Sequence, residues 1–191
     1  MIEHIRNFTD SNNFTKAVIV TIAAVLPVLI LARLGYFEIG FTVAIGAFLT
    51  YPADIPSSLP DRARGLIVAA LIVAGCTLLV NLLHPFPVIY YAVLVPVVFF
   101  LSMISVYGQR ANMVSFSGLL AVALASGHIK TGFDIFTHTS LVFSGGLIYT
   151  IISLLFNYLS PHRYTELQLA ECLRLTSKYM KLRGDLWDPL G

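Results

Sequence analysis

Three arginines stand at the ends of apolar stretches, where their charge could bind an anion. Arg62 and Arg64 follow the stretch YPADIPSSLPD, and Arg110 lies in the turn YGQRAN. Rings of basic side chains select anions in membrane pores, so this set favours a site for an organic anion. The same residues are also typical of anchoring, because arginines beside membrane spans face the cytoplasm and contact anionic lipid. The acidic neighbours Asp54 and Asp61 could pair with the arginines.

Hydroxyl and small residues inside the apolar stretches form a second group of candidates. A hydroxyl in a membrane helix can coordinate a substrate, but serine and threonine commonly bond a preceding backbone carbonyl instead. A glycine there can break a helix or let two helices approach closely. Together with the arginines, these residues make up the predicted substrate pathway: Thr42, Gly46, Arg62, Arg64, Arg110, Ser115 and Ser117.

The sequence indicates no enzyme chemistry. It contains no G-x-S-x-G, H-E-x-x-H, P-loop or dinucleotide-binding motif and no paired cysteines, so we predict no catalytic residue, metal site or cofactor. It also lacks a basic and aromatic surface of the kind that binds nucleic acid. No carboxylate or histidine falls deep inside an apolar stretch, and a proton relay is therefore not predicted.

The elements that must position these residues are membrane helices. Of the 191 residues 57% are hydrophobic and 12% charged, and the mean hydropathy is +0.82, which is typical of an integral membrane protein. The apolar runs are continuous and lack the alternation of barrel strands, so we predict an all-α fold. Six transmembrane helices are predicted at Ala17–Ala32, Ile39–Tyr51, Gly65–Leu83, Phe86–Tyr107, Ala111–Gly127 and Thr139–Leu159.

The distribution of Lys and Arg predicts the orientation of these helices. With both termini in the cytoplasm, ten Lys and Arg residues lie inside and only Arg33 and Lys130 lie outside. An odd number of spans would place the basic C-terminal segment on the wrong side. The N-terminal sequence has no apolar core followed by a small-residue cleavage site, so no cleaved signal peptide is predicted.

The second and fifth segments are unusual because both are short and contain glycine. Ile39–Tyr51 has 13 residues, whereas a helical span needs about 20. If the six spans form two inverted halves of three, these two segments occupy matching positions, which is typical of broken helices at a midplane substrate site. Alternatively, the second segment is a continuous helix extended by Tyr36, Phe37 and Glu38 and packed through its glycines.

The chain divides into three predicted regions. Residues 1–14 form a cytoplasmic N-terminal segment, residues 15–160 the transmembrane domain and residues 161–191 the start of a cytoplasmic helical domain. Apolar residues from Leu169 to Met180 recur at spacings of three and four, which predicts an amphipathic helix. Its pattern continues close to Gly191, so we expect a further soluble domain beyond it.

The segment YFEIGFTVAIGAFLTYPADIPSSLPDRARG resembles the fusaric acid resistance (FUSC) family of bacterial inner-membrane proteins. In that family an aromatic-led span with a Thr-Val pair ends at Pro, and R-x-x-G opens the next helix. Thr42, Val43, Pro52, Arg62 and Gly65 occupy those positions, whereas the bulky residues after Gly65 depart from the pattern. The later stretch SLVFSGGLIYTIISLLFNYLSPHRY is also similar.

The resemblance implies the inner membrane, export of aromatic or other organic acids, and a homodimer or a second six-span half as partner. The plant aluminium-activated malate transporters are similar at a greater distance. Three hypotheses stay open: an exporter of organic anions, a passive anion channel, and a membrane scaffold that carries a cytoplasmic domain without transport. The expected partners are membrane lipid and small organic anions, with no nucleic acid.

Overall fold

The computed structural model of the chain describes residues 12–55, 57–127, 132, 134–159, 169 and 172–183, and within these residues all regular structure is helical. The all-α prediction is therefore confirmed. The helices of the bundle, with two short 3₁₀ turns, are α2 (Asn12–Arg33), α3 (Phe37–Thr50), η1 (Tyr51–Ala53), α4 (Leu59–Leu83), α5 (Pro87–Ile104), η2 (Ser105–Tyr107), α6 (Gln109–Gly127) and α7 (Asp134–Leu159).

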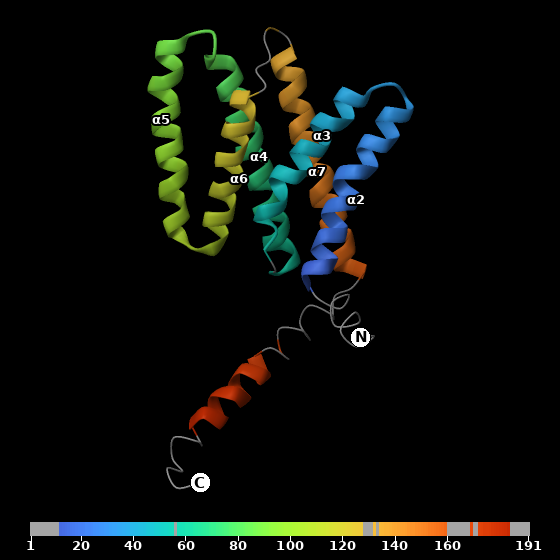
Figure 1. Ribbon diagram of the computed structural model, residues 1–191, viewed down its shortest axis with the longest axis vertical. Coiled ribbons are helices and arrows are strands. Elements are labelled where there is room, and N and C mark those ends of the chain that lie inside the picture. The colour runs from blue at the N-terminus through green and yellow to red at the C-terminus, as the bar shows by residue number, and fades with distance from the viewer. Residues whose placement is uncertain are drawn as a thin grey trace.

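The bundle has α3, α4 and α7 at its centre, with α2 at one side and α5 at the other (Figure 1). Helix α4 is central because one of its faces is buried along its length, at Leu66, Ala69, Val73, Thr77 and Val80. These positions are three or four residues apart, which is the repeat of one helix face. By contrast, the buried residues of α5 are only Tyr90 and Leu101, and its main contacts are with α6, the following turn η2 and α4.

The bundle has a small-residue interior and a bulky apolar exterior. Buried positions include Ala23, Ala47 and Ala121, whereas Phe48 and Phe100 are more than half exposed. Large apolar side chains on the outside are unfavourable in water but suit a hydrocarbon surrounding. The surface therefore agrees with a chain embedded in a membrane.

Within the part of the chain that the structure describes, four helices are long and apolar enough to cross a membrane: Lys16–Arg33, Leu59–Leu83, Pro87–Tyr107 and Asp134–Tyr158. The helical segment Phe37–Ala53 is apolar but shorter, and α6 opens with the polar residues Gln109, Arg110 and Asn112. The structure thus supports four of the six predicted spans by length and composition. Crossing by α3 and α6, and the relation of the chain as two inverted halves, stay predictions.

The predicted break inside the second and fifth segments is wrong. Helix α3 is continuous from Phe37 to Thr50, and α6 is continuous from Gln109 to Gly127. For α3 the alternative prediction, a continuous helix packed through its glycines, is the one that the structure supports. The helix begins at Phe37, and its glycines lie against neighbouring helices. A methyl group added at Gly40 would lie 3.1 Å from the Cβ of Leu31 in α2.

Gly46 also serves packing, at the point where α3 crosses α7. A Cβ atom at Gly46 would lie 2.0 Å from the carbonyl oxygen of Val142, and one at Gly145 would lie 2.0 Å from the carbonyl oxygen of Val43. The two helices therefore contact each other reciprocally through a Val-x-x-Gly stretch on each. Only glycine permits such close approach of two backbones. We call this contact the glycine crossing.

Residues 172–183 form a helix, in agreement with the predicted C-terminal helix. Its apolar residues are exposed, with Leu173, Tyr179 and Met180 each more than three-fifths accessible. Residues 160–168, 170, 171 and 184–191 lie outside the described residues, so the start of the predicted cytoplasmic helical domain at residue 161 is not tested.

Candidate functional site: an arginine-lined cavity beside a buried ion pair

The start of α4 determines the directions in which Arg62 and Arg64 point. Ser58 precedes the first turn of α4, and its Oγ donates a 2.5 Å hydrogen bond to Oδ2 of Asp61. Pro60 lies in that first turn, where the missing backbone N–H costs nothing. Because successive helical residues are about 100° apart, Arg62 and Arg64 point to roughly opposite faces. Arg62 is buried and Arg64 is exposed.

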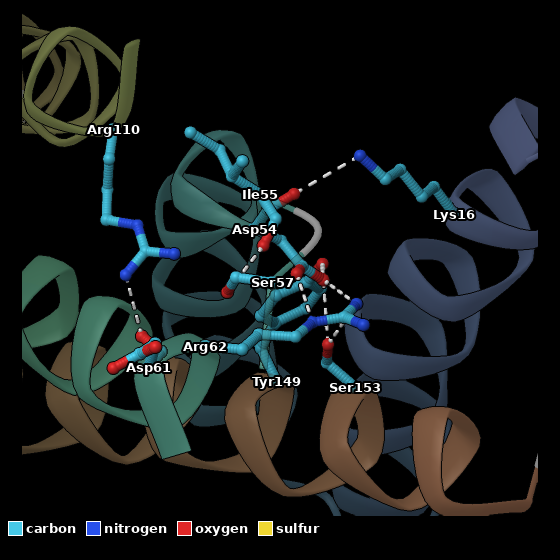
Figure 2. Close-up of polar contacts among 9 residues, drawn as sticks. All are labelled: Lys16, Asp54, Ile55, Ser57, Asp61, Arg62, Arg110, Tyr149 and Ser153. Atoms are coloured by element: carbon cyan, nitrogen blue, oxygen red, sulfur yellow. Dashed lines mark hydrogen bonds and ion pairs between the residues drawn. The ribbon is translucent and has the colours of Figure 1, made fainter. Parts of the chain in front are cut away.

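Arg62 points into the bundle and forms a two-pronged ion pair with Asp54 (Figure 2). Its Nε lies 2.6 Å from Oδ1 and its Nη2 lies 2.8 Å from Oδ2 of the carboxylate. Nη2 also donates to Oγ of Ser153, at 2.9 Å. The Asp54 side chain is fully buried and that of Arg62 is 9% exposed. Such a pair gains from both charge and planar geometry.

Two side chains of α7 complete the hydrogen bonding of the carboxylate. Tyr149 Oη donates to Oδ2 of Asp54 at 2.8 Å, and Ser153 Oγ donates to the same oxygen at 2.7 Å. From α2, Lys16 Nζ donates to the carbonyl oxygen of Asp54 at 3.2 Å. The α3–α4 connection is thereby fastened to α2, α4 and α7. We call Asp54, Arg62, Tyr149 and Ser153 the buried polar cluster.

The buried polar cluster keeps Asp54 ionised. Burial by itself would raise the pKa of Asp54, but the hydrogen bonds and positive charge of Arg62, with those from Ser153 and Tyr149, outweigh it. The pKa of Asp54 therefore lies below its ordinary value. Arg62 is held in this cluster through its Nε and Nη2 groups, so its role is structural in this conformation.

Arg64 and Arg110 together line a cavity of about 430 Å³ on the other side of α4. Its walls are apolar side chains of α4, α5 and α6, including Val68, Ile104 and Val114. Arg110 Nη1 donates to the carbonyl oxygen of Asp61 at 3.0 Å, which orients the guanidinium (Figure 2). The Arg110 stem passes over Gly65, where a Cβ would lie 3.6 Å from Cδ of Arg110.

The basic residues gather at one end of the bundle. The N-terminal ends of α2, α4 and α6 lie at one end of the bundle and the C-terminal end of α2 lies at the other (Figure 1). Of the lysines and arginines that the structure describes in α2–α7, Lys16, Arg62, Arg64 and Arg110 belong to those N-terminal ends, and Arg33 is the last residue of α2. We call the end with these N-termini the basic end. The candidate anion site is therefore the cavity of Arg64 and Arg110 at the basic end.

The other predicted pathway residues do not meet at this cavity. Thr42 Oγ1 donates to the carbonyl oxygen of Glu38, and Ser117 Oγ to that of Met113, so both bond within their own helices. The buried hydroxyl of Ser115 donates to the carbonyl oxygen of Leu101 in α5. Ser115, Ser117 and Gly46 are buried in helix packing, whereas Thr42 lines a different cavity between α3 and α7.

The sequence reasoning missed Tyr149, Ser153 and Tyr107. Tyr149 and Ser153 are four residues apart and hence on one face of α7, which was the available signal for a shared polar partner. Tyr107, in η2, lines the arginine cavity and is 87% exposed. Among the described residues no three or more His, Cys, Asp or Glu side chains gather as a metal site would require.

These features define a helical, multi-pass membrane protein with a basic end. The matching family is described as "FUSC-like inner membrane protein yccS", and its match covers residues 65–191. Since this is well over half of the chain, the chain belongs to the FUSC-like family of inner-membrane proteins. The predicted family resemblance is confirmed.

A curated relative agrees with this assignment. The chain is 23% identical over 160 residues to the inner membrane protein YccS of Escherichia coli strain K12. The alignment covers 82% of this chain and 22% of YccS, so the chain spans about a fifth of that relative's length. No solved structure matches the chain. Family, relative and apolar helices together support a multi-pass inner-membrane protein.

Proposed function

We propose that this chain forms the membrane part of a transport protein that exports aromatic or other organic acid anions. The observation that carries the proposal is the cavity in which Arg64 and Arg110 face an otherwise apolar wall. A carboxylate would bind the guanidinium groups, and its aromatic or aliphatic body would lie against Val68, Ile104 and Val114. The volume of about 430 Å³ lies in the range of small-molecule sites, about 300–1,000 Å³.

The two arginines have complementary parts in this site. One N–H of Arg110 is held by the Asp61 carbonyl, so this guanidinium is oriented before an anion arrives. Arg64 is exposed and can move to close on the bound anion. Arginine suits this task because its planar group can donate two parallel hydrogen bonds to one carboxylate.

The direction of transport rests on the proposed topology. All six helices α2–α7 cross the membrane, and both termini lie in the cytoplasm, so the basic end is the cytoplasmic end. The clustering of Lys16, Arg62, Arg64 and Arg110 there supports this orientation. Cytoplasmic anions would then reach the cavity first, and a second copy or a second six-span half would complete the route.

Flux measurements on the complete protein in proteoliposomes test the proposal. Protein-containing vesicles should take up benzoate-type acids or malate faster than empty vesicles. Arg64→Gln and Arg110→Gln should each lower the flux at least tenfold, whereas Arg33→Gln at the opposite end is the matched control and should not. Equal uptake by empty and protein-containing vesicles would contradict the proposal.

The same experiment separates the two other functions. A passive channel would carry anion current under a voltage alone, with no dependence on a proton gradient. A scaffold without transport is favoured by the continuous helices α3 and α6 and by the mostly apolar lining of the cavity that they share with α4 and α7. It predicts no flux for any organic acid, with normal assembly of the protein.

A further inference from the structure

Two neighbouring cavities lie away from the basic end, one between α3 and α7 and the other between α3, α4, α6 and α7. The first has a volume of about 220 Å³ and is lined by polar groups, notably Glu38 and Thr42 of α3 and Asp134 and Thr137 of α7. The second has a volume of about 240 Å³ and is lined mostly by apolar side chains, notably Phe41, Ile45, Leu124 and Ala125. His138 borders both cavities.

The cavities are neighbours because His138 lines both and because adjacent residues of α3 and of α7 line one or the other, whereas α4 and α6 line the apolar cavity alone. On α3, Thr42 lines the polar cavity and Phe41 lines the apolar one. On α7, Leu141 lines the polar cavity and Val142 lines the apolar one. Each cavity alone is smaller than a usual small-molecule site of about 300–1,000 Å³. A ligand that fits this place therefore has a polar head in one cavity and an apolar tail in the other.

The charge of the polar cavity selects the head group. Glu38 and Asp134 both line it, and no lysine or arginine lines either cavity within the described part of the chain. Both carboxylates lie in the first turn of their helices, where the helix dipole favours negative charge. The structure shows no ion pair between Glu38 and Arg33, both of which it describes. A cationic head is complementary to this lining.

The apolar cavity is reached from the membrane. Phe41 is 52% exposed and Leu124 is 42% exposed, although both line the cavity, so its wall is part of the lipid-facing surface. A tail can therefore enter sideways from the hydrocarbon while the head stays at the polar end.

We propose that these two cavities, which share His138, together bind an amphiphilic cation, an apolar chain or ring that carries a protonated amine. The site is separate from the arginine cavity, which lies at the other end of the bundle and has the opposite charge. Loss of one site would leave the other intact, so the two proposals can fail independently.

Binding to the purified protein in nanodiscs made of phosphatidylcholine alone tests the proposal. The probes are dodecylamine, dodecanol and dodecanoate, which share one tail and differ in head-group charge. Dodecylamine should bind at least tenfold more tightly than either of the others. Glu38→Gln combined with Asp134→Asn should remove that preference, whereas Asp61→Asn, at the basic end, should retain it.

A second variant tests the apolar cavity itself. Ala125→Leu adds bulk inside the cavity and should weaken dodecylamine binding at least tenfold, while Ala32→Leu on the exposed face of α2 is the matched control. Thermal unfolding of each variant shows whether it is folded. A folded Ala125→Leu protein with unchanged binding would overturn the site.

The source of the cation is settled by competition with lipid. If nanodiscs that contain phosphatidylethanolamine lower the affinity for dodecylamine through the same two carboxylates, the resident ligand is an amine-bearing lipid. If they do not, the ligand is a free lipophilic amine. Both results support the proposal, whereas equal binding of amine, alcohol and carboxylate would overturn it.

Discussion

At the scale of single residues, the buried polar cluster holds a buried ion pair among the residues that the structure describes. Asp54 accepts hydrogen bonds from Arg62, Tyr149 and Ser153, so every oxygen of its carboxylate is satisfied although the side chain is fully buried. A buried charge that loses its partner carries the full cost of leaving water. The cluster is therefore sensitive to the removal of any charged member.

Arg62→Met should destabilise the protein by about 3–5 kcal/mol, because it leaves the Asp54 charge buried and unpaired. The matched control is Arg64→Met on the exposed face of the same helix, which should change stability by no more than about 0.5 kcal/mol. Denaturant unfolding in detergent measures both. Equal loss from the two variants would show that Arg62 is not held as the structure describes.

Acid should weaken the buried polar cluster. The folded pKa of Asp54 lies below the ordinary carboxyl value of 3.8, so between these two values the unfolded chain binds more protons than the folded one. Stability from Asp54 is therefore complete above pH 3.8 and is lost as the pH falls through the lower, folded pKa.

The comparison of wild type with Asp54→Asn measures this contribution. Their difference in unfolding free energy should be constant from neutral pH down to the ordinary carboxyl pKa and should shrink in stronger acid. A difference that shrinks already near neutral pH would contradict the lowered pKa of Asp54.

At the scale of elements, the glycine crossing fixes how α3 and α7 pack. Gly46→Ala or Gly145→Ala would place a methyl group 2.0 Å from a backbone carbonyl oxygen. The helices would have to separate, which we expect to cost at least about 1–3 kcal/mol of stability, as in overpacked cores.

Gly75→Ala in α4 is the control for this prediction. Nothing lies within 4 Å of a Cβ at that position, so the change should be neutral or stabilise the helix by up to about 1 kcal/mol. Thermal unfolding in detergent compares the three variants. Normal stability of both Gly46→Ala and Gly145→Ala would exclude the close approach of the two helices.

The all-helical fold was predictable from the sequence, but the structural role of each glycine was not. The lack of charge over long stretches is enough to predict an all-α membrane fold, and the spacing of two between Arg62 and Arg64 already implies opposite faces. A glycine such as Gly46, however, has the same local sequence whether it breaks a helix or packs one. Only the position of Val142, nearly a hundred residues later, decides between the two.

The candidate site was predictable in part for the same reason. Arg64 and Arg110 were found because charge beside an apolar stretch is a local signal. Their cavity also depends on the backbone carbonyl of Asp61, which orients Arg110. Every residue type has such a carbonyl, so this contact could not be predicted from the sequence. Asp54 and Arg62 could be suspected as a pair, whereas Tyr149 and Ser153 join them only through the packing of α7.

At the scale of the whole molecule, the two cysteines give a test of the proposed topology. Cys172 is free and exposed in the C-terminal helix, and Cys76 is free but buried in α4. If the C-terminal helix is cytoplasmic, a membrane-impermeant maleimide should label Cys172 only after the inner membrane of the cells has been permeabilised.

Leu34→Cys in a Cys172→Ser background provides the opposite control. Leu34 is 65% exposed in the α2–α3 turn, at the end opposite the basic end, so this cysteine should react without permeabilisation of the inner membrane. Cys76 should stay unlabelled in the folded protein in both cases. Labelling of Cys172 without permeabilisation of the inner membrane would contradict the proposed cytoplasmic position of the C-terminal helix.

The glycine crossing also has a mechanical consequence. Helices α3 and α7 have the most extensive contact of any helix pair in the bundle, and at Gly46 and Gly145 no side chain separates their main chains. For α3 to slide along α7, the two backbones would first have to separate. The glycine crossing therefore fixes the register of α3 on α7, and with it the distance between Glu38 at one end of α3 and Asp54 beyond the other.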